Sequence, residues 1–204
     1  MRAVILAGGA MRDYAYMRQF IQPEDYIIAA DSGYRHAVAL GIRPHVLLGD
    51  FDSLDILPEG IEILRHPAKK DQTDSELAMN WAVKQGAAQI LLLGGIGTRM
   101  DHTMSNILLL VQFLARGVAV EMIDEHNHIW ITNTALQIAG EAGQLLSLLP
   151  LTTCEGVNTR NLEYPLKDAT LEVGYSLGVS NIIAKSPAEI RLERGTLLVM
   201  KCRD

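Results

Sequence analysis

Short apolar runs alternate with longer amphipathic stretches through the first 124 residues of the chain. A short apolar run bounded by turn residues is typical of a buried strand, and apolar residues spaced three or four apart are typical of a helix. The predicted strands are 3–7, 26–30, 46–48, 61–64, 90–93 and 118–123, and the predicted helices are 11–21, 34–40, 75–85 and 102–116. This alternation predicts an α/β domain with a mostly parallel sheet covered by helices.

The pattern changes after about residue 124, where helical periodicity disappears. Short apolar runs punctuated by Gly, Asn, Asp and Pro follow, which is typical of an antiparallel sandwich or barrel. These runs are 129–132, 136–138, 145–149, 162–165, 170–173, 190–192 and 196–201. We therefore predict an α/β domain over residues 1–124 and an all-β sandwich over residues 125–204.

Composition narrows the classes of partner. The 204-residue chain has a formal net charge of −6, which argues against a general nucleic-acid-binding surface because such a surface needs a basic patch. No stretch is apolar for the length of a membrane span, and the apolar start is too short for a signal peptide, so no membrane partner is expected. Cys154 and Cys202 are far apart and lack metal-ligand spacing, which favours a reducing, cytoplasmic location.

An acidic turn follows one of the predicted strands. Asp50 and Asp52, with Ser53 after them, come directly after the run 46–48 and Gly49. In open α/β sheets ligands bind beyond the carboxyl ends of the strands, and two carboxylates there could converge on a hard cation. The simpler alternative is a plain turn, because Asp and Ser favour turns by bonding their own backbone.

Asp31 and the loop that begins at Gly94 are expected at the same edge of the sheet, because each follows a predicted strand. Asp31 follows the strand 26–30, and residues 70–74 (Lys70, Asp71, Gln72, Thr73 and Asp74) precede the helix 75–85. Several carboxylates brought together would repel one another unless a cation were bound. Thr73 or Asp74 could also simply cap the helix, a role that is compatible with ligand binding.

A glycine-rich segment, 94–97, lies between the strand 90–93 and the helix 102–116. Gly94 and Gly95 could simply allow a tight turn. Alternatively, free backbone N–H groups at the start of the helix could bind an anion, and the Arg99 guanidinium could donate two hydrogen bonds to a phosphate. His102 is more typical of a structural or capping residue than of a base. Asn106, one turn later, could bond His102 or a ligand, or could be a solvated helix position.

Taken together, in their order and approximate spacing, these motifs resemble the thiamine pyrophosphokinase family. The motifs are 31–33, 49–53, 70–76, 94–95 and 99–102, with Asn106. In the second half, residues 157–166 resemble the thiamine-domain segment of the family, and Ser180-Asn181 resembles its later Ser-Asn pair. Two positions differ from the pattern of the family. Asn161 stands where the family commonly has Gly, although Asn tolerates a left-handed backbone. Ile182 stands where an acidic residue is common.

The resemblance implies a subunit with an α/β nucleotide-binding domain and a β-sandwich, paired as a homodimer. Thiamine would bind between the α/β domain of one subunit and the sandwich of the other. The β,γ-pyrophosphoryl group of ATP would move to the thiamine hydroxyl, with release of AMP.

Such a transfer depends mainly on positioning and electrostatics. We assign Asp50, Asp52 and Asp74 to Mg²⁺, and Asp71 to orienting the thiamine hydroxyl or a metal-bound water; these four form the expected catalytic set. The expected nucleotide-site residues are Asp31, Ser53, Lys70, Gln72, Thr73, Gly94, Gly95, Arg99, Asp101, His102 and Asn106. Ser180 and Asn181 are expected to bond the aminopyrimidine of thiamine.

Two other functions fit parts of the sequence. The segment 5–12, with Gly8-Gly9, is similar to the opening glycine loop of Mg²⁺-dependent sugar-phosphate nucleotidyltransferases, although a plain strand-to-helix turn explains it as well. A non-catalytic module that binds a vitamin or a nucleotide is the other alternative. The density of carboxylates around Asp50 disfavours this module, because a pure binder has no need of so many.

Overall fold

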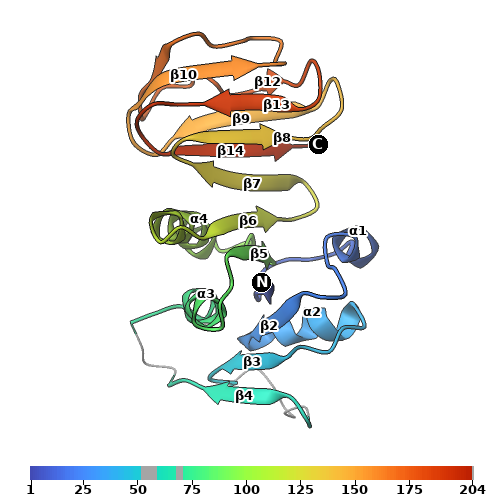
Figure 1. The fold of residues 1–204 in the computed structure, drawn as a ribbon. Coiled ribbons are helices and arrows are strands. Elements are labelled where there is room, and N and C mark those ends of the chain that lie inside the picture. The colour runs from blue at the N-terminus through green and yellow to red at the C-terminus, as the bar shows by residue number, and fades with distance from the viewer. Residues whose placement is uncertain (52–58, 68–70, 204) are drawn as a thin grey trace. The chain divides into compact units, whose positions relative to one another are not determined.

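The computed structural model describes residues 1–51, 59–67 and 71–203 (Figure 1). It divides into two compact units, Met1–Glu125 and His126–Asp204, here called the N-terminal and the C-terminal unit. No helix in the described ranges is both long and apolar enough to cross a membrane.

The N-terminal unit is built on a sheet of strands in the order β6-β5-β1-β2-β3-β4. All of its neighbouring pairs are parallel, which confirms the predicted α/β class. The strands are β1 Arg2–Leu6, β2 Tyr26–Ala30, β3 Val46–Gly49, β4 Glu62–Arg65, β5 Gln89–Leu93 and β6 Ala119–Ile123.

Helices cover both faces of this sheet, with α1 and α2 on one side and α3 and α4 on the other (Figure 1). Residues of β1 such as Val4, Ile5 and Leu6 are therefore fully buried, which explains why this strand is a continuous apolar run. The helices are α1 Tyr14–Arg18, α2 Tyr34–Ala39, α3 Asp74–Lys84 and α4 Met100–Ala115, with a 3₁₀ turn, η1, at Asp31–Gly33.

The predicted helix 11–21 is wrong in extent, because only Tyr14–Arg18 is α-helical. The Asp13 side chain caps the helix by accepting a hydrogen bond from the Tyr16 N–H, so the helix starts late. After Arg18 the chain continues in shorter turns, in which the Phe20 N–H donates to the Met17 carbonyl. The start of α3 is as expected: Thr73 is the N-cap, and its hydroxyl accepts from the Glu76 N–H at 3.2 Å.

The C-terminal unit contains two antiparallel sheets, in the orders β12-β9-β14-β7 and β11-β10-β13-β8. One apolar core takes residues from both sheets, among them Leu146, Val157, Ile190 and Val199, so the predicted sandwich is confirmed. The strands are β7 Asn127–Thr132, β8 Ala135–Ile138, β9 Leu145–Pro150, β10 Cys154–Arg160, β11 Ala169–Leu171, β12 Asn181–Ile182, β13 Ala188–Arg191 and β14 Leu197–Cys202.

The strand prediction at 162–165 is wrong, and the actual strand is β10, just before it. Gly156, at φ +64°, and a register shift between Cys154 and Val157 interrupt the regular alternation of β10, which hides it in the sequence. Asn161 then turns the chain at φ +63°, and Leu162 makes only an isolated bridge to Ile183.

Candidate active site

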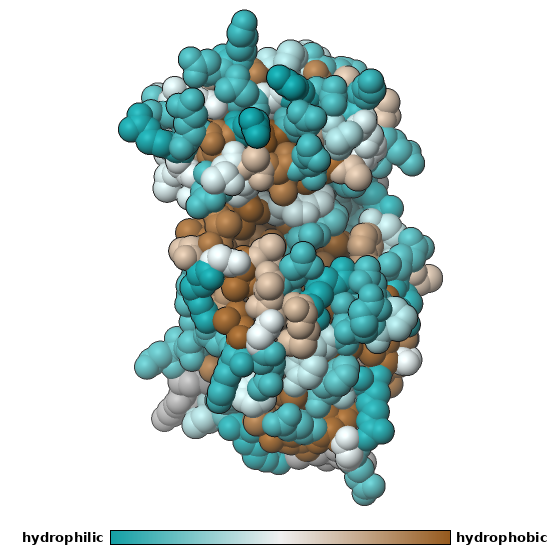
Figure 2. Space-filling model, in the orientation of Figure 1, coloured by the Kyte–Doolittle hydropathy of each residue, from teal (hydrophilic) through white to brown (hydrophobic). Residues whose placement is uncertain are grey.

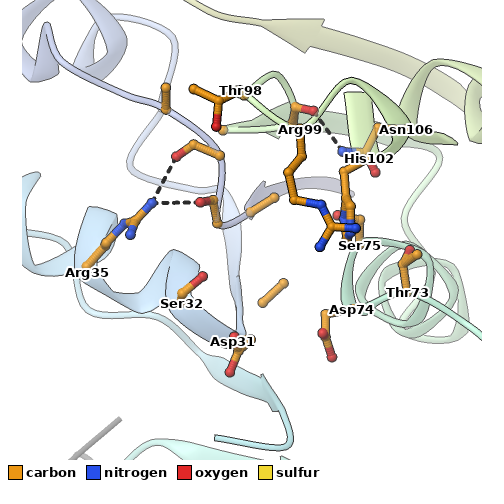
Figure 3. A pocket seen from close by; sticks show the side chains of 18 residues that line it. Asp31, Ser32, Arg35, Thr73, Asp74, Ser75, Thr98, Arg99, His102 and Asn106 are labelled. Atoms are coloured by element: carbon orange, nitrogen blue, oxygen red, sulfur yellow. Dashed lines mark hydrogen bonds between the residues drawn. The ribbon is translucent and has the colours of Figure 1, made fainter. Parts of the chain in front are cut away.

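A cavity of about 480 Å³ opens in the N-terminal unit, among the segments that follow the carboxyl ends of its strands (Figure 3). This is the edge of a parallel sheet at which ligands are expected. The lining residues are 7–10, 30–32, 73–75, 94–95 and 97–99, with Arg35, His102 and Asn106.

Two glycine segments in the wall of the cavity are interlocked: the first is residues 8–10 and the second is residues 94–97. The Gly9 N–H donates to the Gly94 carbonyl at 2.8 Å, and the Ala10 N–H donates to the Ile96 carbonyl at 3.0 Å. A Cβ on Gly9 would lie 2.3 Å from the Gly94 oxygen and 2.4 Å from the Ile96 oxygen. Gly94 has φ +67°, and a Cβ there would lie 2.4 Å from the Ala7 oxygen. Glycine is therefore required because two backbones approach closely, and not only for a tight turn.

Asn106 secures the second glycine segment. Its side chain is only 6% exposed, and its Nδ2 donates to the Gly95 carbonyl at 2.7 Å. The Thr103 hydroxyl accepts from the Gly97 N–H at 3.2 Å, one turn earlier on α4. The interpretation of Asn106 as a solvated helix position is thus wrong, and the side chain orients the loop that leads into α4.

Arg99 lines the cavity beside the start of α4. Its guanidinium donates to both carboxylate oxygens of Asp101, at 3.2 and 2.6 Å, and these hydrogen bonds lower the pKa of Asp101 to about 2. Both side chains are well exposed, and exposed ion pairs add little stability. The Arg99 guanidinium can therefore leave Asp101 and bind an anion such as phosphate. Asp101 itself is not among the lining residues.

Two acidic side chains, Asp31 and Asp74, line the same cavity (Figure 3). Asp31 has φ +47°, an uncommon backbone conformation for a non-glycine residue. A Cβ on Gly49 would lie 2.9 Å from the Asp31 Cβ, so the end of β3 packs directly against Asp31, and Asp50 is the next residue. Carboxylate oxygens of this kind fit a hard cation such as Mg²⁺.

The metal prediction also involves Asp52, which lies outside the described residues, as do Ser53 and Lys70. Among the residues that the structure describes, no group of three or more His, Cys, Asp or Glu side chains is arranged to hold a metal ion. Asp71 is exposed and is not among the lining residues. Gln72 does not line the cavity either, and its amide donates to the Glu76 carboxylate at 2.9 Å.

Arg35 is a lining residue that the sequence did not single out. It belongs to α2, and its Nη2 donates to the Gly8 and Gly9 carbonyls at 2.6 and 3.2 Å (Figure 3). Its position shortly after Asp31 at the end of β2 was the available signal. The other lining residues without an assigned role in the sequence are Ala7, Gly8, Gly9, Ala10, Ala30, Ser32, Ser75, Gly97 and Thr98.

The predicted thiamine contacts lie in the C-terminal unit. Ser180 has φ +58°, and its N–H donates to the Ser147 hydroxyl at 3.0 Å. Asn181 is 4% exposed; its Nδ2 donates to the Tyr164 carbonyl, and its Oδ1 accepts from the N–H groups of Tyr164 and Ile182. The Asn181 amide thus fixes the backbone at Tyr164, while Ser180 is exposed. Asn161 keeps the left-handed turn that was expected where the family commonly has Gly.

Two sequence models of one protein family match the chain. The model described as "Thiamin pyrophosphokinase, catalytic domain" matches residues 17–122, and "Thiamin pyrophosphokinase, vitamin B1 binding domain" matches residues 132–197.

Individual relatives carry the same description. The thiamine pyrophosphokinase of Bacillus subtilis (strain 168) is 26% identical over 209 residues, which cover 98% of each chain. The crystal structure of a thiamine pyrophosphokinase from Bacillus subtilis superimposes with a TM-score of 0.91 at 25% identity and covers 100% of both chains. The enzyme from Geobacillus thermodenitrificans gives 0.87 at 26% identity and covers 100% of this chain and 98% of its own.

Proposed function

The chain belongs to the thiamin pyrophosphokinase family, and we propose on this premise that the cavity of the N-terminal unit holds the triphosphate of ATP. The reaction of the family transfers the pyrophosphoryl group of ATP to the hydroxyl of thiamine. One observation supports the proposal most strongly: backbone from two interlocked glycine segments, two arginines and two carboxylates surround a single cavity (Figure 3). A cavity of about 480 Å³ is within the usual range for small-molecule sites.

The phosphates would bind at the side of the cavity formed by the glycine segments and α4. The backbone N–H groups at the start of α4 and the partial positive charge of the helix favour an anion there. Arg35 and Arg99 line the same cavity and would add two positive charges against the triphosphate. Asp71 would orient the thiamine hydroxyl for direct, in-line attack, without a covalent intermediate on the protein.

Mg²⁺ is the proposed cofactor, and Asp50, Asp52 and Asp74 are its proposed ligands. The fit rests on donor chemistry, since Asp74 and Asp31 line the cavity and Asp50 follows the glycine that packs on Asp31. When bound, the ion would neutralise charge on the β- and γ-phosphates. The carboxylates have a second role in the proposal, because their field favours the cationic thiazolium ring of thiamine.

We also propose a homodimer in which Ser180 of one subunit serves the cavity of the other. Exposed apolar side chains support a subunit contact near α4, where Met100, Met104 and Leu108 recur every fourth residue and are 66%, 48% and 54% exposed. Hydrophobic side chains gather on the surface where Figure 1 draws α4 (Figure 2). In the C-terminal unit the residues before Ser180 include exposed Tyr175, Leu177 and Val179.

Mixed dimers test this arrangement. Asp74→Asn and Ser180→Ala subunits, each poorly active alone at low thiamine, should regain activity when refolded together, because one of the two shared sites then receives both wild-type residues. If each site were formed within a single subunit, every subunit in the mixture would still carry one substitution, and no activity would be recovered. Activity that stays at the average of the two variants would therefore contradict a shared site.

The cytoplasm is the proposed location, because Cys154 and Cys202 are far apart in the sequence and lack metal-ligand spacing, which suits a reducing compartment. The nucleotidyltransferase alternative is not favoured, since the Gly8-Gly9 segment that suggested it is accounted for by its packing against Gly94 and Ile96. The binding-module alternative is not favoured either, because both matched domains are those of a kinase family.

Product identification tests the proposed function. The protein is incubated with ATP, MgCl₂ and thiamine, and the products are separated by chromatography, with an EDTA-treated sample as the control. AMP and thiamine diphosphate in equal amounts are expected only with Mg²⁺. Release of inorganic pyrophosphate would support nucleotidyl transfer instead, and saturable thiamine binding without ATP consumption would support a binding module.

A further inference from the structure

Helix α2 holds the backbone of the first glycine segment from one side. The Nη2 of Arg35 donates to the carbonyls of Gly8 and Gly9, and the Nε2 of His36 lies 2.9 Å from the same Gly9 carbonyl. The two side chains differ in setting, because Arg35 is exposed at the cavity whereas His36 is 2% exposed.

The second glycine segment holds the same two peptide groups from the other side. In the Gly8–Gly9 peptide, the carbonyl is bound by Arg35 and the N–H donates to Gly94. In the Gly9–Ala10 peptide, the carbonyl is bound by His36 and the N–H donates to Ile96. Because both ends of each peptide group are satisfied, the segment is restricted to one orientation in the wall of the cavity.

The proton arrangement on His36 follows from its partners. The Gly9 carbonyl can only accept, so Nε2 carries the hydrogen, and Nδ1 accepts from the Tyr14 hydroxyl at 2.9 Å. Burial lowers the pKa of His36, although the hydrogen bond to Gly9 acts in the opposite direction, and the ring is neutral at pH 7. A Cβ on Gly94 would lie 3.6 Å from the Cδ2 of His36, so the ring packs close to both glycine segments.

We propose that His36 is a positioning residue for ATP: by holding the Gly9 carbonyl, with its own tautomer fixed by Tyr14, it sets the glycine segment against which the triphosphate binds. The inference rests on the proposed function, because His36 can position ATP only if the cavity binds ATP. His36 does not touch the substrate in this account. Its contribution is to affinity for ATP, through a loop whose conformation would otherwise relax.

The test compares three variants in the full chain. His36→Phe keeps a planar ring but removes both hydrogen bonds, whereas His36→Gln retains an amide N–H close to the position of Nε2. His45→Phe is the matched control, because His45 also makes a hydrogen bond to backbone, accepting from the Ile27 N–H at 3.0 Å. His45 directly precedes β3, so it lies at the amino ends of the strands and not at the carboxyl ends where the cavity opens. Steady-state kinetics with ATP and with thiamine, and thermal melting, are measured for each.

We expect His36→Phe to raise KM for ATP about tenfold, roughly the effect of one lost hydrogen bond, with KM for thiamine unchanged and kcat within about threefold. His36→Gln should recover KM for ATP to within about threefold of wild type, a rescue that a purely structural role does not predict. His45→Phe should lower the melting temperature and leave both KM values unchanged.

A normal KM for ATP in folded, active His36→Phe would overturn the inference, as would an equal rise in His45→Phe. Should His36→Phe fail to fold, Tyr14→Phe carries the test: loss of its hydroxyl should raise KM for ATP about threefold, and an unchanged value would overturn the inference. A wild-type protein that makes no AMP from ATP and thiamine would refute the proposed function itself, which separates the two failures.

Discussion

Substitution of Gly9 by alanine gives the sharpest prediction about the cavity. The added Cβ would lie 2.3 and 2.4 Å from two backbone oxygens, those of Gly94 and Ile96. These contacts are far inside van der Waals distance, and neither oxygen belongs to a side chain that can rotate away. The two segments must separate, which weakens the hydrogen bonds from Gly9 and Ala10 to the second segment.

The expected cost combines overpacking, about 1–3 kcal/mol, with partial loss of two hydrogen bonds of about 1 kcal/mol each. A destabilisation of about 3 kcal/mol corresponds to a fall in melting temperature on the order of 10 °C for a protein of this size. Because a shift of about 1 Å in a positioned group can cost about a hundredfold in rate, we expect kcat/KM for ATP to fall about a hundredfold.

Gly41→Ala is the matched control. Gly41 also resists substitution, since its φ is +64°, but a Cβ there meets nothing within 4 Å, and the residue follows α2 away from the cavity. This variant should lose about 1 kcal/mol of stability and retain kcat/KM for ATP. Equal kinetic losses in the two variants, or full activity in folded Gly9→Ala, would refute the reasoning.

Asp52, Ser180 and Asp25 each give a further prediction. Asp52→Asn, tested with excess Mg²⁺, should lose turnover about a hundredfold with little change in melting temperature, and near-normal AMP production by the folded variant would exclude a metal role. Ser180→Ala should raise KM for thiamine and leave KM for ATP unchanged; the reverse pattern would count against the assigned contact. Asp25 is 3% exposed and binds Arg2 through two hydrogen bonds of 2.8 and 2.7 Å, so Asp25→Asn should destabilise the protein by about 2 kcal/mol at pH 7. Burial acts to raise the pKa of Asp25, but the hydrogen bonds from Arg2 and the Gln22 N–H outweigh it, and the pKa is lowered. The stability advantage of the wild type over Asp25→Asn should therefore be complete above about pH 4 and disappear as the pH falls through the lowered pKa. Urea unfolding at several pH values measures this difference.

The N-terminal unit could be predicted well because its signals are local. Apolar runs such as 26–30 match the strands directly, and Thr73 followed by Glu76 marks the start of α3. Segments that follow parallel strands were expected to lie together, and Asp31 and Gly94, which follow two different strands, do line one cavity. The extent of α1 was not predictable in the same way, because Asp13 caps a helix that apolar spacing alone extends in both directions.

The features that the sequence did not reveal depend on distant contacts. The need for glycine at position 9 comes from the carbonyl of Gly94, and the role of His36 comes from the carbonyl of Gly9. Asn181 was expected to face thiamine, yet most of its amide is used by the backbone of Tyr164, a contact between segments that no spacing rule anticipates. Irregular strands such as β10 are hidden for a related reason, since Gly156 breaks their alternation.

The central claim is that the cavity delivers the β- and γ-phosphates of ATP together to thiamine. Incubation with thiamine, Mg²⁺ and ATP labelled with ³²P at the γ-phosphate tests it most directly, with the products separated by thin-layer chromatography. The account predicts that all transferred label appears in thiamine diphosphate, in amounts equal to the AMP formed. Label in inorganic phosphate or inorganic pyrophosphate, or in thiamine monophosphate alongside ADP, would contradict it.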